Sequence, residues 1–62
     1  MSVLWKVERF LRQSSMPDTK FGRLAVNDPR LVSDLRQGRE PRPGTTARIE
    51  AAIARLHSEH RA

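Results

Sequence analysis

The strongest constraint in this sequence is a short helix with a clear signal at each of its ends. Asp28 is a good N-cap, because a short carboxylate accepts hydrogen bonds from the free N–H groups of a first turn. Pro29 suits the first helical position, where no N–H is needed. Gly38 can adopt the left-handed conformation that ends a helix. We therefore expect a helix over residues 28–37 with one apolar and one polar side.

Two helices are expected before this one. Residues 2–13 carry apolar side chains at intervals of three and four, and Ser2 is a fair N-cap for them. Residues 17–25 follow, opened by Pro17 at a position that suits the start of a helix. The side chains expected to face inward from this second segment are Phe21, Leu24 and Ala25.

A loop with two prolines, residues 38–44, separates this region from a last helix. That helix should begin at Thr45 or Thr46, either of which can serve as N-cap, and continue to about His57. We see no segment with the pattern of a strand. The sequence predicts one compact all-α domain of four, or at most five, short helices over residues 1–62.

The charge balance favours a polyanionic partner. The 62 residues include 12 Lys and Arg against 7 Asp and Glu, which gives a net charge of +5. Without cysteine, neither a disulfide nor a thiolate metal site can support the small core. No run of about 18 apolar residues is present, and the first residues lack the order of a signal peptide. We therefore expect a cytoplasmic protein without a membrane partner, and the initial Met indicates a complete product.

The sequence offers no catalytic or metal-binding constellation. His57 and His60 are three residues apart, but no cysteine completes a metal site, and Glu59 points off their face. Ser14 and Ser15 have no neighbouring base, and a glycine-rich phosphate loop is missing. We therefore expect neither an enzyme nor a metal, cofactor or small-molecule ligand.

Several features of the second to fourth segments occur together in one protein family. Gly22 holds the place of a small residue that lets two helices cross closely, and Val32 and Leu35 can pack back across that crossing. The sequence Gln-Gly-Arg at 37–39 leads into a proline-containing loop and a helix with Ala-Arg-Ile at 47–49. In these respects the chain resembles the lambda-repressor and Cro type of helix-turn-helix domain, which is common in phage and bacterial regulators.

The resemblance covers residues 17–56 and implies that helix 28–37 lies in the major groove of DNA. One position departs from the family pattern, because the corner usually given to Gly holds Val26, with Asn27 next. Asn tolerates the left-handed region better than other non-Gly residues, so the turn is expected one residue later. Gly22 should accept Ala, which is still small and is the better helix former.

The resemblance implies that the outer face of helix 28–37 meets the bases. Arg30 in its first turn can bond the O6 and N7 of guanine together, and the alternative is a surface pair with Asp34. Asp34 can accept from a cytosine amino group or hold Arg30 in place, and we favour the second. Ser33 can reach a base or a phosphate, and Gln37 lies at the helix end. The candidate base-contacting residues are thus Arg30, Ser33, Asp34 and Gln37.

Phosphate contacts are expected on both sides of that face. Thr19 and Lys20 lie at the start of the second helix, whose N-terminal N–H groups favour a phosphate. Arg36, Arg39 and Arg42 surround the loop after helix 28–37. The alternative for that loop is an ordinary solvated connector, since a glutamate dilutes its charge. Neutralising several phosphates would make the affinity fall steeply with salt.

The implied function is sequence-specific binding of double-stranded DNA by a transcriptional regulator, a repressor that binds an inverted repeat as a homodimer. One domain of this size reads about four to six base pairs, which two-fold pairing doubles. The candidate dimer contacts are Trp5, Ile53 and Leu56, although the last two can instead complete the monomer core. The alternative function is a protein-interaction module, antitoxin-like or an adaptor. The polar outer face of helix 28–37 favours DNA.

Overall fold

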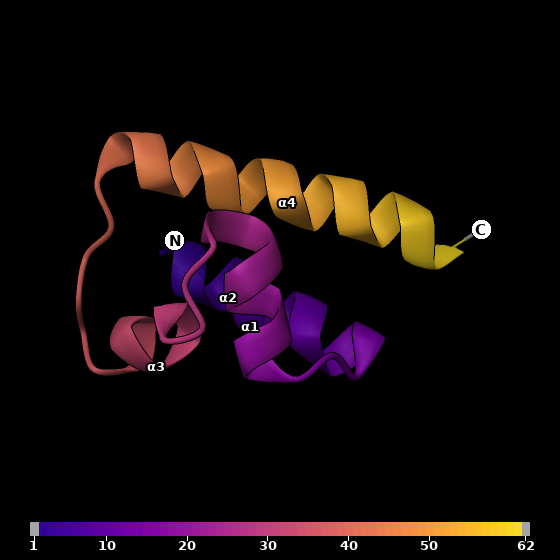
Figure 1. The fold of residues 1–62 in the computed structure, drawn as a ribbon, viewed down its shortest axis with the longest axis horizontal. Helices are drawn as coiled ribbons and strands as arrows, with labels where there is room; N and C mark the ends of the chain where they lie inside the picture. Colours follow the sequence, from indigo (N-terminus) through magenta and orange to yellow (C-terminus); the bar gives the residue numbers. More distant parts are fainter. Residues whose placement is uncertain (1, 62) are drawn as a thin grey trace.

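The long C-terminal helix lies across three shorter helices (Figure 1). The structure, a computed structural model, describes residues 2–61 and the side chains of residues 2–59. The elements in this part of the chain are all α-helices: α1 (Val3–Ser14), α2 (Asp18–Val26), α3 (Leu31–Arg36) and α4 (Pro43–Arg61). Helices α1 and α2 pack against α4, and α3 packs against α2 and α1. The expected all-α architecture of four helices is therefore confirmed.

One apolar core joins the four helices. Its largest fully buried side chains are Val7, Phe21, Val32 and Ile49, one from each helix. Each of them contributes about 1.5–3 kcal/mol to folding, before the opposing chain entropy. Phe10 of α1 contacts Phe21 of α2, with the ring centroids 5.6 Å apart and the ring planes tilted by 47°. The other buried apolar side chains are Val3, Leu11, Ala25, Leu31, Leu35 and Ala52.

Leu24 is an exception to the predicted inward face of α2, because 43% of it is exposed. The helix instead buries Phe21, Gly22 and Ala25. At 3.6 residues per turn, Leu24 lies about 100° around the helix from the middle of this buried side. The inward face of α2 is therefore turned toward its glycine, and the expectation for Leu24 was wrong.

The starts of α1 and α4 also differ from expectation. Ser2 has an extended backbone but makes no side-chain capping hydrogen bond, so α1 begins at Val3 without that cap. Helix α4 begins at Pro43 rather than at either threonine, since a first helical position needs no N–H. The N–H of Thr46 donates to the carbonyl of Arg42 (2.8 Å), which is the first bond of the helix. Neither α4 nor any other described helix is long and apolar enough to cross a membrane.

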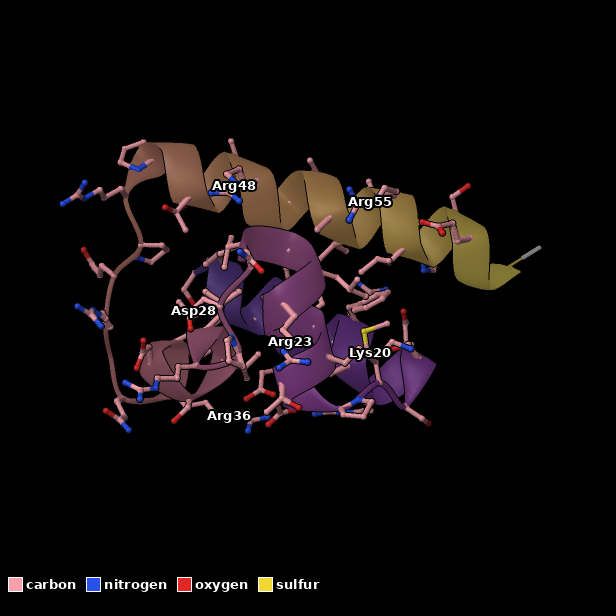
Figure 2. The ribbon with its side chains drawn as sticks, in the orientation of Figure 1. Lys20, Arg23, Asp28, Arg36, Arg48 and Arg55 are labelled. Carbon is pink, nitrogen blue, oxygen red and sulfur yellow. The ribbon has the colours of Figure 1, made fainter. Side chains whose placement is uncertain are left out.

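Two polar contacts hold α4 against the helices beneath it. Lys6 of α1 forms an ion pair with Glu50 of α4. Arg55 of α4 donates from Nη2 to the carbonyl of Leu24, near the end of α2 (3.3 Å). A cation there is favourable, because the last carbonyls of a helix have no partner within it. Figure 2 shows Arg55 on the stretch of α4 above α2.

Candidate nucleic-acid interface

Helix α2 and the turn before α3 touch through their backbones at Gly22. A Cβ atom placed on Gly22 would lie 2.2 Å from the carbonyl oxygen of Asp28 and 3.3 Å from the Cβ of Leu31. The N–H of Asp28 donates to the carbonyl of Gly22 (3.1 Å), which closes the same contact. The close crossing expected at Gly22 is therefore present. It is tighter than we expected, because even the methyl group of Ala would displace the turn.

The turn itself is set by three consecutive residues. Asn27 has a left-handed backbone (φ 58°), and Val26 remains in α2, so the predicted shift of the corner by one residue is confirmed. The carboxylate of Asp28 accepts from the N–H of Arg30 (2.9 Å), and its carbonyl accepts from the N–H of Leu31 (3.2 Å). Asp28 therefore stabilises the turn before α3, but it is not the N-cap that we expected, because Arg30 holds that position and makes no side-chain capping hydrogen bond.

This turn makes α3 shorter than the predicted helix over 28–37. Arg30 has φ −91° and ψ 0°, the values of the third residue of a type I turn. Proline is favoured in the second position of that turn and aspartate in the first, which are the residues found here. Asp28 to Arg30 thus form a separate turn, and the α-helix comprises Leu31–Arg36.

The end of α3 follows the pattern expected from Gly38. Its backbone is left-handed (φ 93°), and its N–H donates to the carbonyl of Leu35 (3.1 Å). The N–H of Arg39 donates to the carbonyl of Asp34 (3.1 Å). These two bonds form a Schellman motif, which satisfies carbonyls that the helix leaves free and sends the chain sharply away.

Helix α3 has one buried and one polar side. Leu31, Val32 and Leu35 are buried, whereas Ser33 is exposed. Arg30 and Gln37, which flank the helix, are also exposed. Leu31 therefore belongs to the core. The outer side of α3 is hydrophilic, as the sequence pattern predicts.

Asp34 does not hold Arg30, which corrects our preferred role for it. The carboxylate of Asp34 accepts from Arg39 Nη1 at 3.3 Å. The N–H of Asp34 donates to the carbonyl of Arg30 (2.9 Å), but no ion pair joins the side chains of these two described residues. Asp34 instead ties Arg39, the last residue of the Schellman motif, to α3.

Arg36 is held by two carboxylates from other helices. Its Nε and Nη2 donate to the Glu8 carboxylate of α1 (2.9 and 2.7 Å), and its Nη1 donates to Asp18 of α2 (2.6 Å). The hydrogen bonds from Arg36 lower the pKa of Glu8 below its ordinary value. These contacts conflict with the expected phosphate role of Arg36. Figure 2 shows Arg36 at the edge of the molecule, below α2.

The exposed face of α2 forms a basic groove with the turn before α3. The groove has a volume of about 430 Å³ and brings together Thr19 and Lys20, two predicted phosphate contacts. It adds Arg23, which the sequence analysis missed, although its spacing of three from Lys20 places both on one side of the helix. Figure 2 shows Lys20 and Arg23 together on α2. The two prolines that complete the lining are Pro17 and Pro29.

A second groove lies where α3, the following loop and the start of α4 meet. Arg39 and Arg42, two further predicted phosphate contacts, line it with Arg48 of α4. Arg48 was not among the predicted site residues, because only the fold brings α4 beside this loop. Three acidic residues also line the groove: Asp28, Asp34 and Glu40.

Most carboxylates of the chain are already paired with cations. Of the seven acidic residues, those in ion pairs are Glu8, Asp18, Asp34, Glu50 and Glu59. Five cations on α2, the turn before α3, the loop after α3 and α4 have no such partner among the described side chains: Lys20, Arg23, Arg30, Arg42 and Arg48. In the second groove, Asp28 and Glu40 are also outside these ion pairs. The groove on α2 therefore carries uncompensated positive charge that attracts polyanions, whereas the charges that line the second groove balance.

The three residues expected at a dimer interface differ in exposure. Trp5 is 48% exposed and stacks under the guanidinium of Arg9, 5.6 Å from the ring centroid. Trp5 and Ile53 line one groove of about 460 Å³ between α1 and α4. Ile53 and Leu56 are partly buried and pack against the core. They thus help to complete the monomer, and Trp5 remains as the exposed apolar group.

His57 and Ser14, two of the residues considered for chemistry, have ordinary surroundings. His57 lines the groove beside Trp5, and the side chain of His60 lies outside the described residues. In the part of the chain that the structure describes, no three potential metal ligands gather. The Ser14 hydroxyl accepts from the N–H of Met16 (3.3 Å), a local contact at the end of α1.

No match to this chain was found among protein-family models, curated proteins or solved structures. The resemblance to the lambda-repressor and Cro type therefore rests on the residues of the chain itself.

Proposed function

We propose that this chain is a sequence-specific DNA-binding transcriptional regulator, in which α2 and α3 form a helix-turn-helix of the lambda-repressor and Cro type. The observation that carries the proposal is the contact at Gly22, where the backbone of Asp28 lies directly against α2. This crossing fixes α3 with its apolar side in the core and its polar side toward solvent. A helix held in this way can present side chains to base edges in the major groove.

Base reading belongs to the side chains that remain free on and around α3. Arg30 is exposed and has no ion-pair partner among the described side chains, so its guanidinium is available to guanine O6 and N7. Ser33 and Gln37 are exposed and four residues apart, a spacing that suits contacts along one side of a helix. Asp34 supports the interface indirectly, by holding Arg39.

Phosphate binding belongs to the cations that line the two grooves. Thr19, Lys20 and Arg23 would meet one stretch of backbone at the start of α2, where helix N–H groups favour an anion. Arg42 and Arg48, with Arg39 beside them, would meet another stretch at the loop after α3. Each phosphate contact releases counterions, so the affinity should depend strongly on salt.

The proposal includes a homodimer that represses transcription at an inverted repeat. A single six-residue helix reads few base pairs, and a two-fold partner doubles the site. Trp5, half exposed beside Ile53 in the α1–α4 groove, is the group best suited to anchor the second subunit. An exposed tryptophan is costly to leave in water and is a common centre of an interface.

A gel shift with the DNA upstream of the chain's own gene tests this function, because small regulators of this type often act on their own promoters. We expect a discrete complex that survives excess competitor DNA of scrambled sequence. The matched control is Arg12→Ala, which removes an exposed arginine from α1 that lines neither the proposed phosphate-binding grooves nor the groove beside Trp5. The control variant should still form a complex that survives excess competitor DNA of scrambled sequence. If competitor of any sequence removes the complex equally, sequence-specific binding is refuted.

A further inference from the structure

Apart from the contact of its preceding turn with Gly22, helix α3 has few means of keeping a fixed orientation. It has six residues, and a turn precedes it while a loop follows it. Its apolar contacts, from Leu31, Val32 and Leu35, lie along a single side and face α2 and α1. A single apolar stripe holds α3 against α1 and α2 but does little to prevent rotation of α3 about its own axis, because burial has little directionality.

Arg36 supplies directional contacts on a different side of the helix. One guanidinium group donates three hydrogen bonds, two to Glu8 of α1 and one to Asp18 of α2. The planar fork of arginine fixes the direction of each bond, which a lysine ammonium cannot do. Arg36 thus fastens the end of α3 to both helices on which α3 rests.

We propose that Arg36, Glu8 and Asp18 form a clasp that sets the orientation of α3 on DNA, with Arg36 as a positioning residue that contacts neither base nor phosphate. This inference rests on the proposed function, since it names what makes that interface specific. The clasp leaves base contact to Arg30, Ser33 and Gln37. All three clasp side chains are partly exposed, so their effect on global stability is small, as for other surface ion pairs.

One variant separates the clasp from a plain charge effect, because charge alone changes the affinity for every DNA and the clasp changes the discrimination between sequences. Glu8→Gln with Asp18→Asn removes two negative charges and frees the Arg36 guanidinium. By charge alone this variant should bind every DNA more tightly. If the clasp orients α3, the same variant should discriminate less well between sequences. The quantity to measure is therefore the ratio of two affinities.

The experiment compares a duplex selected by the wild-type protein from a random pool with a scrambled duplex of the same composition. In the Glu8→Gln/Asp18→Asn variant we expect the ratio of the two affinities to fall about tenfold, the discrimination of roughly one base contact. The matched control is Glu50→Gln with Glu59→Gln, which removes two charges from α4. Its ratio should stay at the wild-type value. A ratio unchanged in both variants would overturn the clasp.

Two further measurements keep the result interpretable. Arg36→Lys retains the charge without the fork, and it should lower the ratio while leaving the melting temperature close to that of the wild type. Amide hydrogen exchange of the free protein reads the clasp without DNA. The N–H groups of Asp34 and Gln37, which bond to Arg30 and Ser33 within the α3 region, should exchange faster in the Glu8/Asp18 variant than in the α4 control. Equal exchange would overturn the clasp, whereas a wild type without any sequence preference would refute the proposed function instead.

Discussion

Replacing Gly22 with alanine should destabilise the protein, although alanine is the better helix former. In the middle of a helix, Gly→Ala alone contributes about 1 kcal/mol of stability. At Gly22 the new Cβ atom would lie 2.2 Å from the carbonyl oxygen of Asp28, far inside the ordinary contact distances of 3.4–4 Å. That oxygen belongs to the backbone and cannot rotate away. The turn must therefore move by roughly 1 Å, at an overpacking cost of about 1–3 kcal/mol.

Gly44 provides a matched control for this substitution. It also lies in a helix, near the start of α4, but nothing lies within 4 Å of the position of its Cβ atom. Gly44→Ala should therefore stabilise the protein by up to about 1 kcal/mol. The difference in unfolding free energy between the two variants isolates the cost of the contact with Asp28.

Thermal and urea unfolding, followed by circular dichroism, measure this difference. For a domain of this size, 1 kcal/mol shifts the melting temperature by about 4–8 °C. We expect Gly22→Ala to melt at least about 4 °C below Gly44→Ala. Gly22→Leu should melt lower still, since a larger side chain forces α2 and the turn further apart. Equal stability of Gly22→Ala and Gly44→Ala would refute the close crossing of α2 and the turn.

Three other predictions follow from named contacts. Arg30→Ala should weaken binding to the selected duplex by about 1–3 kcal/mol and leave non-specific binding nearly intact. Arg23→Ala should instead weaken binding to all sequences and lower the slope of log affinity against log salt concentration by about one. Equal losses on all sequences from both variants would show that Arg30 reads no base. Sedimentation at micromolar concentration should show a dimer that Trp5→Glu dissociates without unfolding, and a 7.1 kDa monomer in the wild type would contradict it. Arg36 lowers the pKa of Glu8, so that carboxylate stabilises the fold above its ordinary pKa of 4.5 and loses this effect as the pH falls through the lower folded value. The Glu8→Gln variant should therefore lose less stability than the wild type on acidification. Identical loss of stability at low pH in both proteins would contradict the contact.

The parts of the fold that sequence predicted well depend on neighbouring residues. Asn27 and Gly38 are left-handed as expected, because local sterics decide which residue can adopt a positive φ. The buried sides of α1 and α3 follow from helical spacing. The start of α4 at Pro43 could have been predicted in the same way, since proline favours the first helical position. We placed it at Thr45 or Thr46 instead, because threonine is a good N-cap.

The parts that sequence did not predict depend on contacts between distant segments. The hydrogen bonds of Arg36 join α3 to Glu8 and Asp18, which lie 28 and 18 positions earlier in the sequence. No local pattern specifies such a pairing. The crossing at Gly22 was expected, but its tightness depends on where the Asp28 carbonyl falls in space. Arg48 becomes a neighbour of the loop only because α4 returns beside it. For the candidate interface, the sequence therefore predicted the residue types. Which of those side chains form ion pairs within the protein, and which remain available to DNA, depends on the fold.

Selection of duplexes from a random DNA pool, repeated with the wild type and with Arg30→Ala, tests the central claim most directly. We expect the wild type to enrich one motif with two-fold symmetry and half-sites about 34 Å apart or a multiple of that distance. We also expect Arg30→Ala to enrich a related motif that has lost its preference for guanine at one position in each half-site. A wild type that enriches no motif, or an Arg30→Ala variant that enriches the unchanged motif with unchanged affinity, would contradict the account.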